Sequence, residues 1–264
     1  TAGKGVGQNT GKRPLAFEEF FHGKMERISG VLPVYRDSAK VYMEIPECLL
    51  GRELEIRAQV NKGFDMVARP LESMGVVYLQ KVEDHSIYIQ RRLFSERVAD
   101  KNNELYKALC KSNKQPVDII YPVVAYSADE KGYIIDITDM LKTGDDWFKV
   151  TASQIREQDA SRARILGVHE FSDGVSFTIH RMCGFSPERL LDNVIPPRGF
   201  LPLEIGCVVT LLPERDMRER FADRRFGYHV ISFLDYSQNP YRAEKDSIIR
   251  KWNLGITKDS RREI

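Results

Sequence analysis

The sequence contains no run of about 20 consecutive apolar residues, the length that a helix needs to cross a bilayer. We therefore expect no membrane span. The chain begins TAGKGVGQNTGKRP, without an initiating Met and without the apolar stretch of a signal peptide. We interpret this polar start as a flexible tail, which was left either by removal of a leader peptide or by the point at which the chain was cut.

An excess of charge of one sign is also missing. The chain has 40 Lys and Arg against 38 Asp and Glu, a formal net charge of +2. Nucleic acids and anionic membranes attract proteins with a broad basic field, which this balance does not provide. We expect no nucleic-acid partner, and any basic patch must be local.

Cysteine is scarce and widely spaced. The four residues Cys48, Cys110, Cys183 and Cys207 form no C-x-x-C pair. In an exported protein they could pair in three ways, whereas free, buried thiols are the default in a chain of 264 residues, which can build a core without disulfides. Cysteine usage therefore leaves the cellular compartment open.

What the sequence does contain is alternation with a period of two, typical of half-buried strands. Val41, Met43 and Ile45 alternate with other residues, as do Leu54 and Ile56, and we expect 41–46 and 53–60 to form a hairpin through IPECLLGR. Further hairpins are predicted where turn residues interrupt similar patterns. They cover residues 75–94, 117–138 and 163–182. Later strands are expected within 205–212, 226–234 and 246–254.

Helical patterns are fewer and short. An aromatic stripe from Phe17 to Met25 predicts a first helix that stops by Gly30, and a second is expected between residues 95 and 116. Other short helices are predicted at 137–143, 145–158 and 186–193. The predicted fold class is α+β, with predominantly antiparallel β-sheets and a few short helices.

Near residues 60–75 the sequence shows neither the alternation of a strand nor the spacing of a helix, which suggests a domain boundary. We divide the chain into a flexible tail (1–16), a small region with a helix and a hairpin (17–66), and a larger α+β accessory domain (67–264).

Metal-ligating and catalytic motifs are not found. His169-Glu170 begins like H-E-x-x-H, but Asp173 occupies the second His position beside a turn. His180 and Cys183 would point to opposite faces of a strand. There is no G-x-S-x-G motif, and the acidic pairs Asp136/Asp139 and Asp145/Asp146 fit helix caps better than a calcium loop. We predict no catalytic and no metal-binding residue in this chain.

The stretch PERDMRERFADRRFGY (213–228) interleaves arginines and acids around two phenylalanines. The charges could pair locally on a solvated connector, or the Arg forks could dock against carboxylates of another domain. Composition alone does not decide between these interpretations.

Four segments together resemble a known family. They are FEEFF (17–21), VYMEIPECLLGRELEIRAQV (41–60), YPVVAYSADEKGYIIDITDML (121–141) and the stretch from VVTLL to RKWNL (208–254). They resemble the N-terminal region of large bacterial zinc-dependent metalloproteases, in which two domains of unknown function precede a zincin catalytic domain.

This resemblance implies an exported protein that is periplasmic, secreted or on the cell surface. It also implies that zinc and the H-E-x-x-H motif belong to a catalytic domain outside the matched region. The chain would then be a non-catalytic accessory region whose partners are its own C-terminal zincin domain and a peptide or protein substrate. The family-like positions in 213–228 are candidates for the interdomain contact. They are Met217, Arg220, Asp223, Arg225, Gly227 and Tyr228.

An alternative is a stand-alone extracytoplasmic module that binds peptide or glycan through an exposed sheet edge or aromatic side chains. The aromatic candidates for that role are Trp147, Tyr236, Tyr241 and Trp252. Enzymatic activity of the chain itself is a third interpretation, although no nucleophile, metal set or acid-base pair converges in the sequence.

Overall fold

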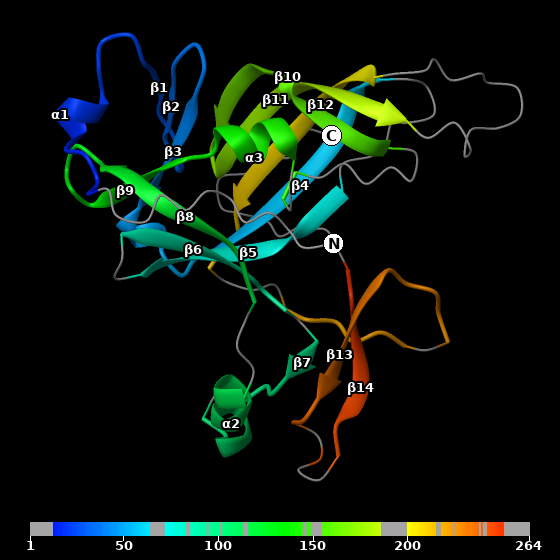
Figure 1. Cartoon of the computed structure of the whole chain (residues 1–264). Coiled ribbons are helices and arrows are strands. Elements are labelled where there is room, and N and C mark those ends of the chain that lie inside the picture. Colours follow the sequence, from blue (N-terminus) through cyan, green and yellow to red (C-terminus); the bar gives the residue numbers. More distant parts are fainter. Residues whose placement is uncertain are drawn as a thin grey trace, which may run out of the picture. The chain divides into compact units, whose positions relative to one another are not determined.

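The computed structural model describes most of the chain (Figure 1). The described residues are 13–63, 72–82, 85–93, 95–100, 102–112, 116–144, 147–148, 155–185, 200–214, 218–223, 225–237, 239 and 242–250. The chain divides into a larger unit, residues 1–92 and 116–212, and a smaller unit, residues 93–115 and 213–264. This division differs from the predicted segments, since strands from both sides of residue 66 pair within the larger unit.

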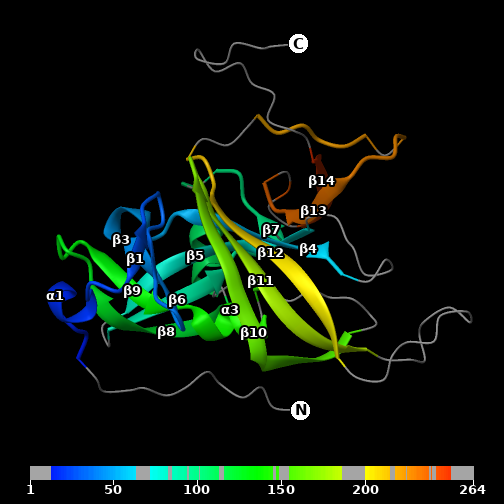
Figure 2. The same cartoon turned by 90° about the horizontal axis from the view of Figure 1, so that it is seen from above.

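One sheet dominates the larger unit (Figure 2). In the described residues it has eleven strands in the order β1-β2-β3-β9-β8-β6-β5-β4-β12-β11-β10, and each neighbouring pair is antiparallel. Its first six strands in chain order are β1 (Glu26–Ile28), β2 (Val34–Arg36), β3 (Val41–Pro46), β4 (Glu53–Lys62), β5 (Glu72–Val82) and β6 (Ser86–Arg91). The remaining five are β8 (Val117–Tyr126), β9 (Gly132–Asp136), β10 (Ile155–Phe171), β11 (Gly174–Phe185) and β12 (Phe200–Leu211). The prediction of a mostly antiparallel β protein with few helices is confirmed.

Three predicted hairpins are present. β5 pairs with β6, β8 with β9, and β10 with β11, each across the turn that the sequence indicated. In these places an alternating pattern ends at turn-forming residues and resumes within a few positions, so local pairing satisfies the backbone at little entropic cost.

The hairpin predicted from residues 41–60 is wrong. β3 pairs with β2 and β9, whereas β4 pairs with β5 and β12. The connection between β3 and β4 contains a 3-10 turn, η1 (Glu47–Leu49), and Gly51 with a φ of 77°. Gly51 N–H donates to the carbonyl oxygen of Leu79 in β5, 2.9 Å away. This contact anchors the connection beside β5, so it leads the chain from one part of the sheet to another.

Helix predictions are partly confirmed. α3 (Thr138–Thr143) lies within the predicted 137–143, but α1 (Phe17–Phe20) covers only four residues of the stripe that ends at Met25. Extended backbone at Phe21 ends α1, and its aromatic rings pack instead against Tyr35 of β2, with the Phe20 and Tyr35 centroids 5.7 Å apart. The helix predicted over 145–158 is wrong at its end, where β10 begins at Ile155. The helix predicted at 186–193 lies outside the described residues.

The two ends of the sheet approach each other. Strands β1 and β2 lie beside β10, and Arg36 Nη2 donates a hydrogen bond of 2.9 Å to the carbonyl oxygen of Ile165. Gly30 also lies beside β10, since a Cβ added there would lie 2.7 Å from Oε2 of Glu170. The nearly closed sheet surrounds the main core. Among its fully buried side chains are Ile45, Ile56, Leu79, Ile89 and Phe177.

Helix α3 packs on the core through Met140 and Leu141, and hydrogen bonds tie it to β3 and β11. Thr138 Oγ1 accepts a hydrogen bond of 2.9 Å from the amide of Val41 in β3. At the other end of α3, the buried side chain of Arg181 from β11 donates to the carbonyl oxygens of Leu141 (2.9 Å from Nε) and Phe148 (2.8 Å from Nη1). A cation at the C-terminus of a helix satisfies free carbonyls and complements the helix dipole.

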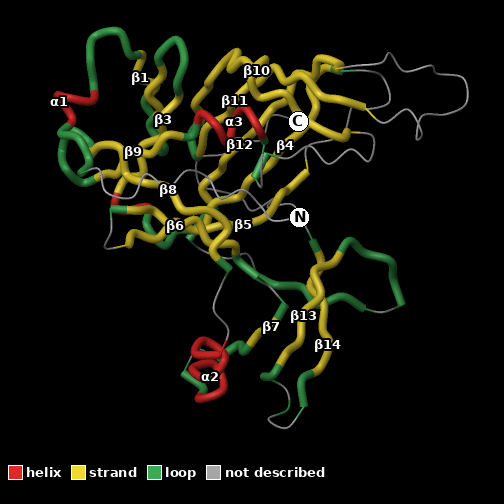
Figure 3. Tube along the Cα trace, in the orientation of Figure 1, coloured by secondary structure: helices red, strands yellow, loops and turns green. Residues whose placement is uncertain are grey.

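The smaller unit is built around a short sheet (Figure 3). In its described residues, β13 (Val230–Asp235) pairs antiparallel with β14 (Glu244–Ile249) and parallel with β7 (Glu96–Arg97). Helix α2 (Glu104–Ser112) confirms the helix predicted between residues 95 and 116.

Candidate functional site

The segment predicted as a connector or docking surface adds an edge to the sheet of the smaller unit. Ile249 N–H donates to the carbonyl oxygen of Arg220 (2.9 Å), and Ala222 N–H donates to that of Ser247 (2.8 Å). Phe221 forms an antiparallel bridge with Ile248. These contacts hold part of the segment in an extended form along β14, on the side opposite to β13.

Further along the chain, before and on β13, four apolar side chains are open to solvent. Alternation along β13 places Val230 and Leu234 on one face, and the bond from Arg250 N–H to the carbonyl oxygen of His229 extends the β13–β14 ladder by one residue toward Tyr228. Phe226 contacts Tyr228 with ring centroids 6.1 Å apart. Phe226 is 60% exposed, and the other three are 37–40% exposed. We call Phe226, Tyr228, Val230 and Leu234 the outer row.

The other face of β13 is the covered one. Phe233 and Asp235 are buried there. The guanidinium of Arg97 lies 5.4 Å from the Phe233 ring centroid and 6.0 Å from that of Phe221, and Arg97 Nη1 is 2.7 Å from a carboxylate oxygen of Glu219. The unit therefore has a small packed side and an open apolar side.

Charges within the segment pair locally. Arg225 donates to Asp223 from Nε (3.0 Å) and from Nη2 (2.5 Å), and this contact lowers the pKa of the Asp223 carboxyl. Arg225 also lies 6.0 Å from the Phe226 ring centroid. Because the pair is solvent-exposed, it fixes local geometry more than it contributes to the free energy of unfolding.

The structure brings most of the predicted contact residues together. Arg220, Asp223, Arg225, Gly227 and Tyr228 lie on the edge segment or beside the outer row, whereas Met217 lies outside the described residues. Their carrying an interdomain contact stays a prediction.

Aromatic residues proposed for the alternative binding module are less available. Trp147 is 2% exposed and packs in the core of the larger unit, so its proposed role as a surface aromatic is wrong. Tyr236 is partly buried and donates a hydrogen bond of 3.2 Å to Glu96. Tyr241 and Trp252 lie outside the described residues.

His180 and Cys183, considered above as possible metal ligands, lie on opposite faces of β11. Cys183 is buried and shares the inward parity of Arg181 on β11, while His180 lies on the other face, as predicted. Within the described residues, no three His, Cys, Asp or Glu side chains group closely enough to hold a metal ion.

The cysteines are all free, but only two are buried. Cys183 and Cys207 lie in the core, where burial raises the thiol pKa to about 11 and about 12, respectively. Cys48 and Cys110 are exposed, so the prediction of buried thiols is wrong for them.

Asp136 and Asp139 do not cap α3, because Ile137 occupies the N-cap position and no side chain forms a cap hydrogen bond, but Asp136 does bind the first amide of the helix. Asp136 Oδ1 accepts a hydrogen bond of 3.0 Å from the amide of Thr138 at the start of α3, and its Oδ2 is 3.1 Å from Lys40 Nζ. Asp145 and Asp146 lie outside the described residues.

Arg181 and Gly144 were not predicted to matter. A signal for Arg181 was present, because it occupies the same parity as Val175, Phe177 and Ile179 in GVSFTIHRMCGF and must therefore share their inward face. The need for glycine at 144 depends on the arrival of Arg181 from a distant strand, which no local pattern reveals.

The described fold defines a class of β-rich protein, in which a nearly closed antiparallel sheet is joined to a small unit with an exposed apolar face. The chain belongs to the family of the domain of unknown function DUF5117, whose family model matches residues 71–257, and a second family model, the domain of unknown function DUF5118, matches residues 14–54. Comparison with curated proteins and with solved structures finds no match. Among the described residues, no helix is long and apolar enough to cross a membrane.

Proposed function

We propose that this chain is the non-catalytic accessory region of an exported zinc-dependent metallopeptidase, and that its smaller unit contacts the catalytic domain of the same polypeptide. The proposal starts from the resemblance of residues 208–254 to the region that precedes a zincin domain. Zinc and the H-E-x-x-H motif belong, in this proposal, to that catalytic domain.

The observation that carries the proposal is the outer row. Val230 and Leu234 lie on one face of β13 with Ser232 between them, Phe226 and Tyr228 precede the strand, and all four apolar side chains are exposed. A small sheet of short strands is marginally stable without a packing partner, and exposed apolar side chains gathered on one part of a protein often mark a site of protein contact.

Composition around the outer row fits a protein interface. Aromatic and Arg side chains are enriched at the centres of such interfaces, and Arg225 lies against Phe226 beside Tyr228. The Arg225–Asp223 pair holds the guanidinium in place, which reduces the entropy lost on docking.

Activity and stability of the full-length protein test the proposal. The double variant Phe226→Ser/Tyr228→Ser removes two aromatic anchors, and we expect peptidase activity or the midpoint of thermal inactivation to fall, with activity lower by about tenfold. Leu166→Ser is the matched control, because Leu166 is 50% exposed on β10 of the larger unit.

Unchanged activity and thermal stability in the double variant would contradict the interdomain contact. A reading frame that lacks H-E-x-x-H after this region would contradict the peptidase assignment and favour the stand-alone binding module. Zinc analysis of the isolated chain provides a further check, since a tightly bound stoichiometric zinc in residues 1–264 would overturn the non-catalytic role.

A further inference from the structure

A pocket of about 260 Å³ opens in the larger unit where the β2–β3 turn, α3 and β10 meet. Residues 36–41 line one side, Lys142 of α3 a second, and residues 163–165 of β10 a third. The pocket therefore lies where the two ends of the sheet approach each other.

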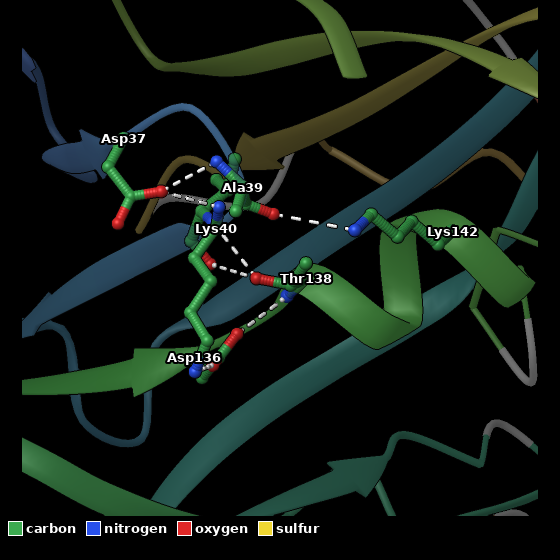
Figure 4. Close-up of polar contacts among 7 residues, drawn as sticks. Asp37, Ala39, Lys40, Asp136, Thr138 and Lys142 are labelled. Carbon is green, nitrogen blue, oxygen red and sulfur yellow. Dashed lines mark hydrogen bonds and ion pairs between the residues drawn. The ribbon is translucent and has the colours of Figure 1, made fainter. Parts of the chain in front are cut away.

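Basic side chains dominate its lining. Arg36, Lys40, Lys142 and Arg164 contribute four cations, against one carboxylate from Asp37. Lys40 is partly neutralised, since its Nζ lies 3.1 Å from Asp136. Asp37 is held by the amides of Ala39 and Lys40, both 2.7 Å from its Oδ1 (Figure 4). These bonds direct one carboxylate oxygen to the backbone of its own turn.

Among the described residues, the side chains of Arg36, Lys142 and Arg164 form hydrogen bonds only with carbonyl oxygens and form no ion pair. Arg36 Nη2 donates to Ile165 (2.9 Å), and Arg164 Nη1 donates to Ala163 (2.9 Å) and Ser161 (3.3 Å). Figure 4 shows Lys142 reaching from α3 toward the carbonyl oxygen of Ala39, 3.4 Å from its Nζ. A carbonyl accepts the hydrogen bond but does not cancel the charge.

From this excess of positive charge we infer that the pocket binds a small tetrahedral dianion, namely phosphate, sulfate or the terminal group of a phosphate or sulfate ester. Each guanidinium carries five N–H donors, and the described contacts use one N–H group of Arg36 at Ile165. The planar fork of Arg matches the oxygens of such an anion, and Lys142 adds a point charge from the opposite wall.

The size and surroundings of the pocket favour this class of ligand. A volume of about 260 Å³ lies below the range of roughly 300–1,000 Å³ typical of pockets for drug-sized molecules, but it is ample for one anionic group. Arg36 and Lys142 are half-buried, so attraction to the anion is screened less than at an open surface. A ligand held by Arg36, Lys142 and Arg164 would link β2, α3 and β10, and so stabilise the closure of the sheet.

Isothermal titration of the 264-residue chain with sodium phosphate, at constant ionic strength, tests the inference. We expect saturable binding with a dissociation constant in the millimolar range or tighter, and a rise in the midpoint of thermal unfolding of several degrees at saturation. Glycerol phosphate separates the free ion from an ester, because a site for an ester group binds glycerol phosphate at least as tightly as phosphate, and sulfate compares a second inorganic dianion with phosphate. Acetate should bind about tenfold more weakly, since it carries a single charge.

The variant Lys142→Met/Arg164→Met removes two cations from the pocket and should weaken phosphate binding by about tenfold or more. Lys62→Met/Arg57→Met is the control, because it removes the same charge from β4 of the same unit, outside the pocket. Either single variant, Lys142→Met or Arg164→Met, serves if the double variant does not fold. Absence of saturable phosphate binding, equal affinity in the pocket and control variants, or acetate binding as tight as phosphate binding would overturn the inference.

Discussion

The guanidinium of Arg181 on β11 donates to the carbonyl oxygen of Leu141 from both Nε and Nη2, with Nε 2.9 Å from the oxygen. Leu141 lies in the last turn of α3, whose first turn is tied to β3 through Thr138 and Val41. A buried side chain from one part of the sheet thus holds the helix that is attached to another part.

Replacing Arg181 by Met should destabilise the larger unit strongly. Met keeps an unbranched apolar stem but leaves the carbonyls of Leu141 and Phe148 without the donors of Arg181 in a buried site. We expect the free energy of unfolding to fall by about 3 kcal/mol, measured by urea denaturation. Arg225→Met, which breaks an exposed ion pair, is the control and should cost less than ~1 kcal/mol. Equal effects of the two variants would contradict the account of α3.

Gly144 should not tolerate a side chain. It follows α3 with a φ of 70°, and an added Cβ would lie 2.2 Å from Nη1 of Arg181 and 2.9 Å from the carbonyl oxygen of Phe148. Gly144→Ala therefore combines an unfavourable left-handed conformation with a steric clash, and we expect a loss of ~3 kcal/mol or more.

A matched control isolates the clash at Gly144. Gly51 has a φ of 77°, but an added Cβ would meet nothing within 4 Å. Gly51→Ala should cost only the conformational term, ~1 to 2 kcal/mol. The two variants can be compared by chemical denaturation, and a similar loss in both would show that Arg181 does not restrict position 144.

Thiol reactivity should divide the four cysteines into two pairs. Cys48 and Cys110 are exposed and should react promptly with an aromatic disulfide reagent at pH 8. Burial shields Cys183 and Cys207 and raises the pKa of both thiols, so these two should react only when the protein unfolds. We expect two thiols per chain in the native titration and four in guanidinium chloride. Rapid reaction of all four in native protein would show that the core placement of β11 and β12 is incorrect.

Alkaline pH should weaken the fold through Tyr35. Burial, reinforced by the hydroxyl's hydrogen bond of 2.5 Å to Glu44, raises the pKa of Tyr35 from 10.0 to about 12. In this interval the folded protein retains a proton that the unfolded chain has lost. The stabilisation is therefore complete below pH 10 and is lost as the pH rises toward 12.

Tyr35→Phe tests this dependence. It removes the titrating hydroxyl, so its free energy of unfolding should fall less steeply between pH 10 and pH 12 than that of the parent chain, by about 2 kcal/mol over the interval. Deprotonation of Cys183 and Cys207 also lowers the free energy of unfolding at high pH, but equally in both proteins. The difference between the two pH profiles therefore reports on Tyr35 alone. Parallel profiles for Tyr35→Phe and the parent would contradict the assignment.

Local sequence patterns predicted the elements better than their partners. The hairpins across Asp173, Glu130 and His85 were predictable, because each turn joins strands that pair directly with each other. The segments 41–46 and 53–60 carry the same alternation but pair with distant strands, and alternation specifies which face a residue lies on rather than which strand lies beside it.

The sites show the same limit. The exposed segment around Arg225 and Tyr228 was recognisable because its charged and aromatic residues adjoin in sequence. The pocket between Arg36, Lys142 and Arg164 was missed, since these residues come from three separate elements that meet only after the sheet curves. The position of such a site depends on contacts between strands that are far apart in the sequence, and local sequence patterns do not specify those contacts.

Thiol labelling of Leu234→Cys tests the proposal that a catalytic domain covers the outer row. The background carries Cys48→Ser and Cys110→Ser, and Leu166→Cys is the control because Leu166 is also exposed. In the 264-residue chain both introduced thiols should react rapidly. In the full-length protein, we predict that the thiol at 234 reacts at least about tenfold more slowly while that at 166 is unchanged. Equal labelling of position 234 in the two proteins would contradict the account.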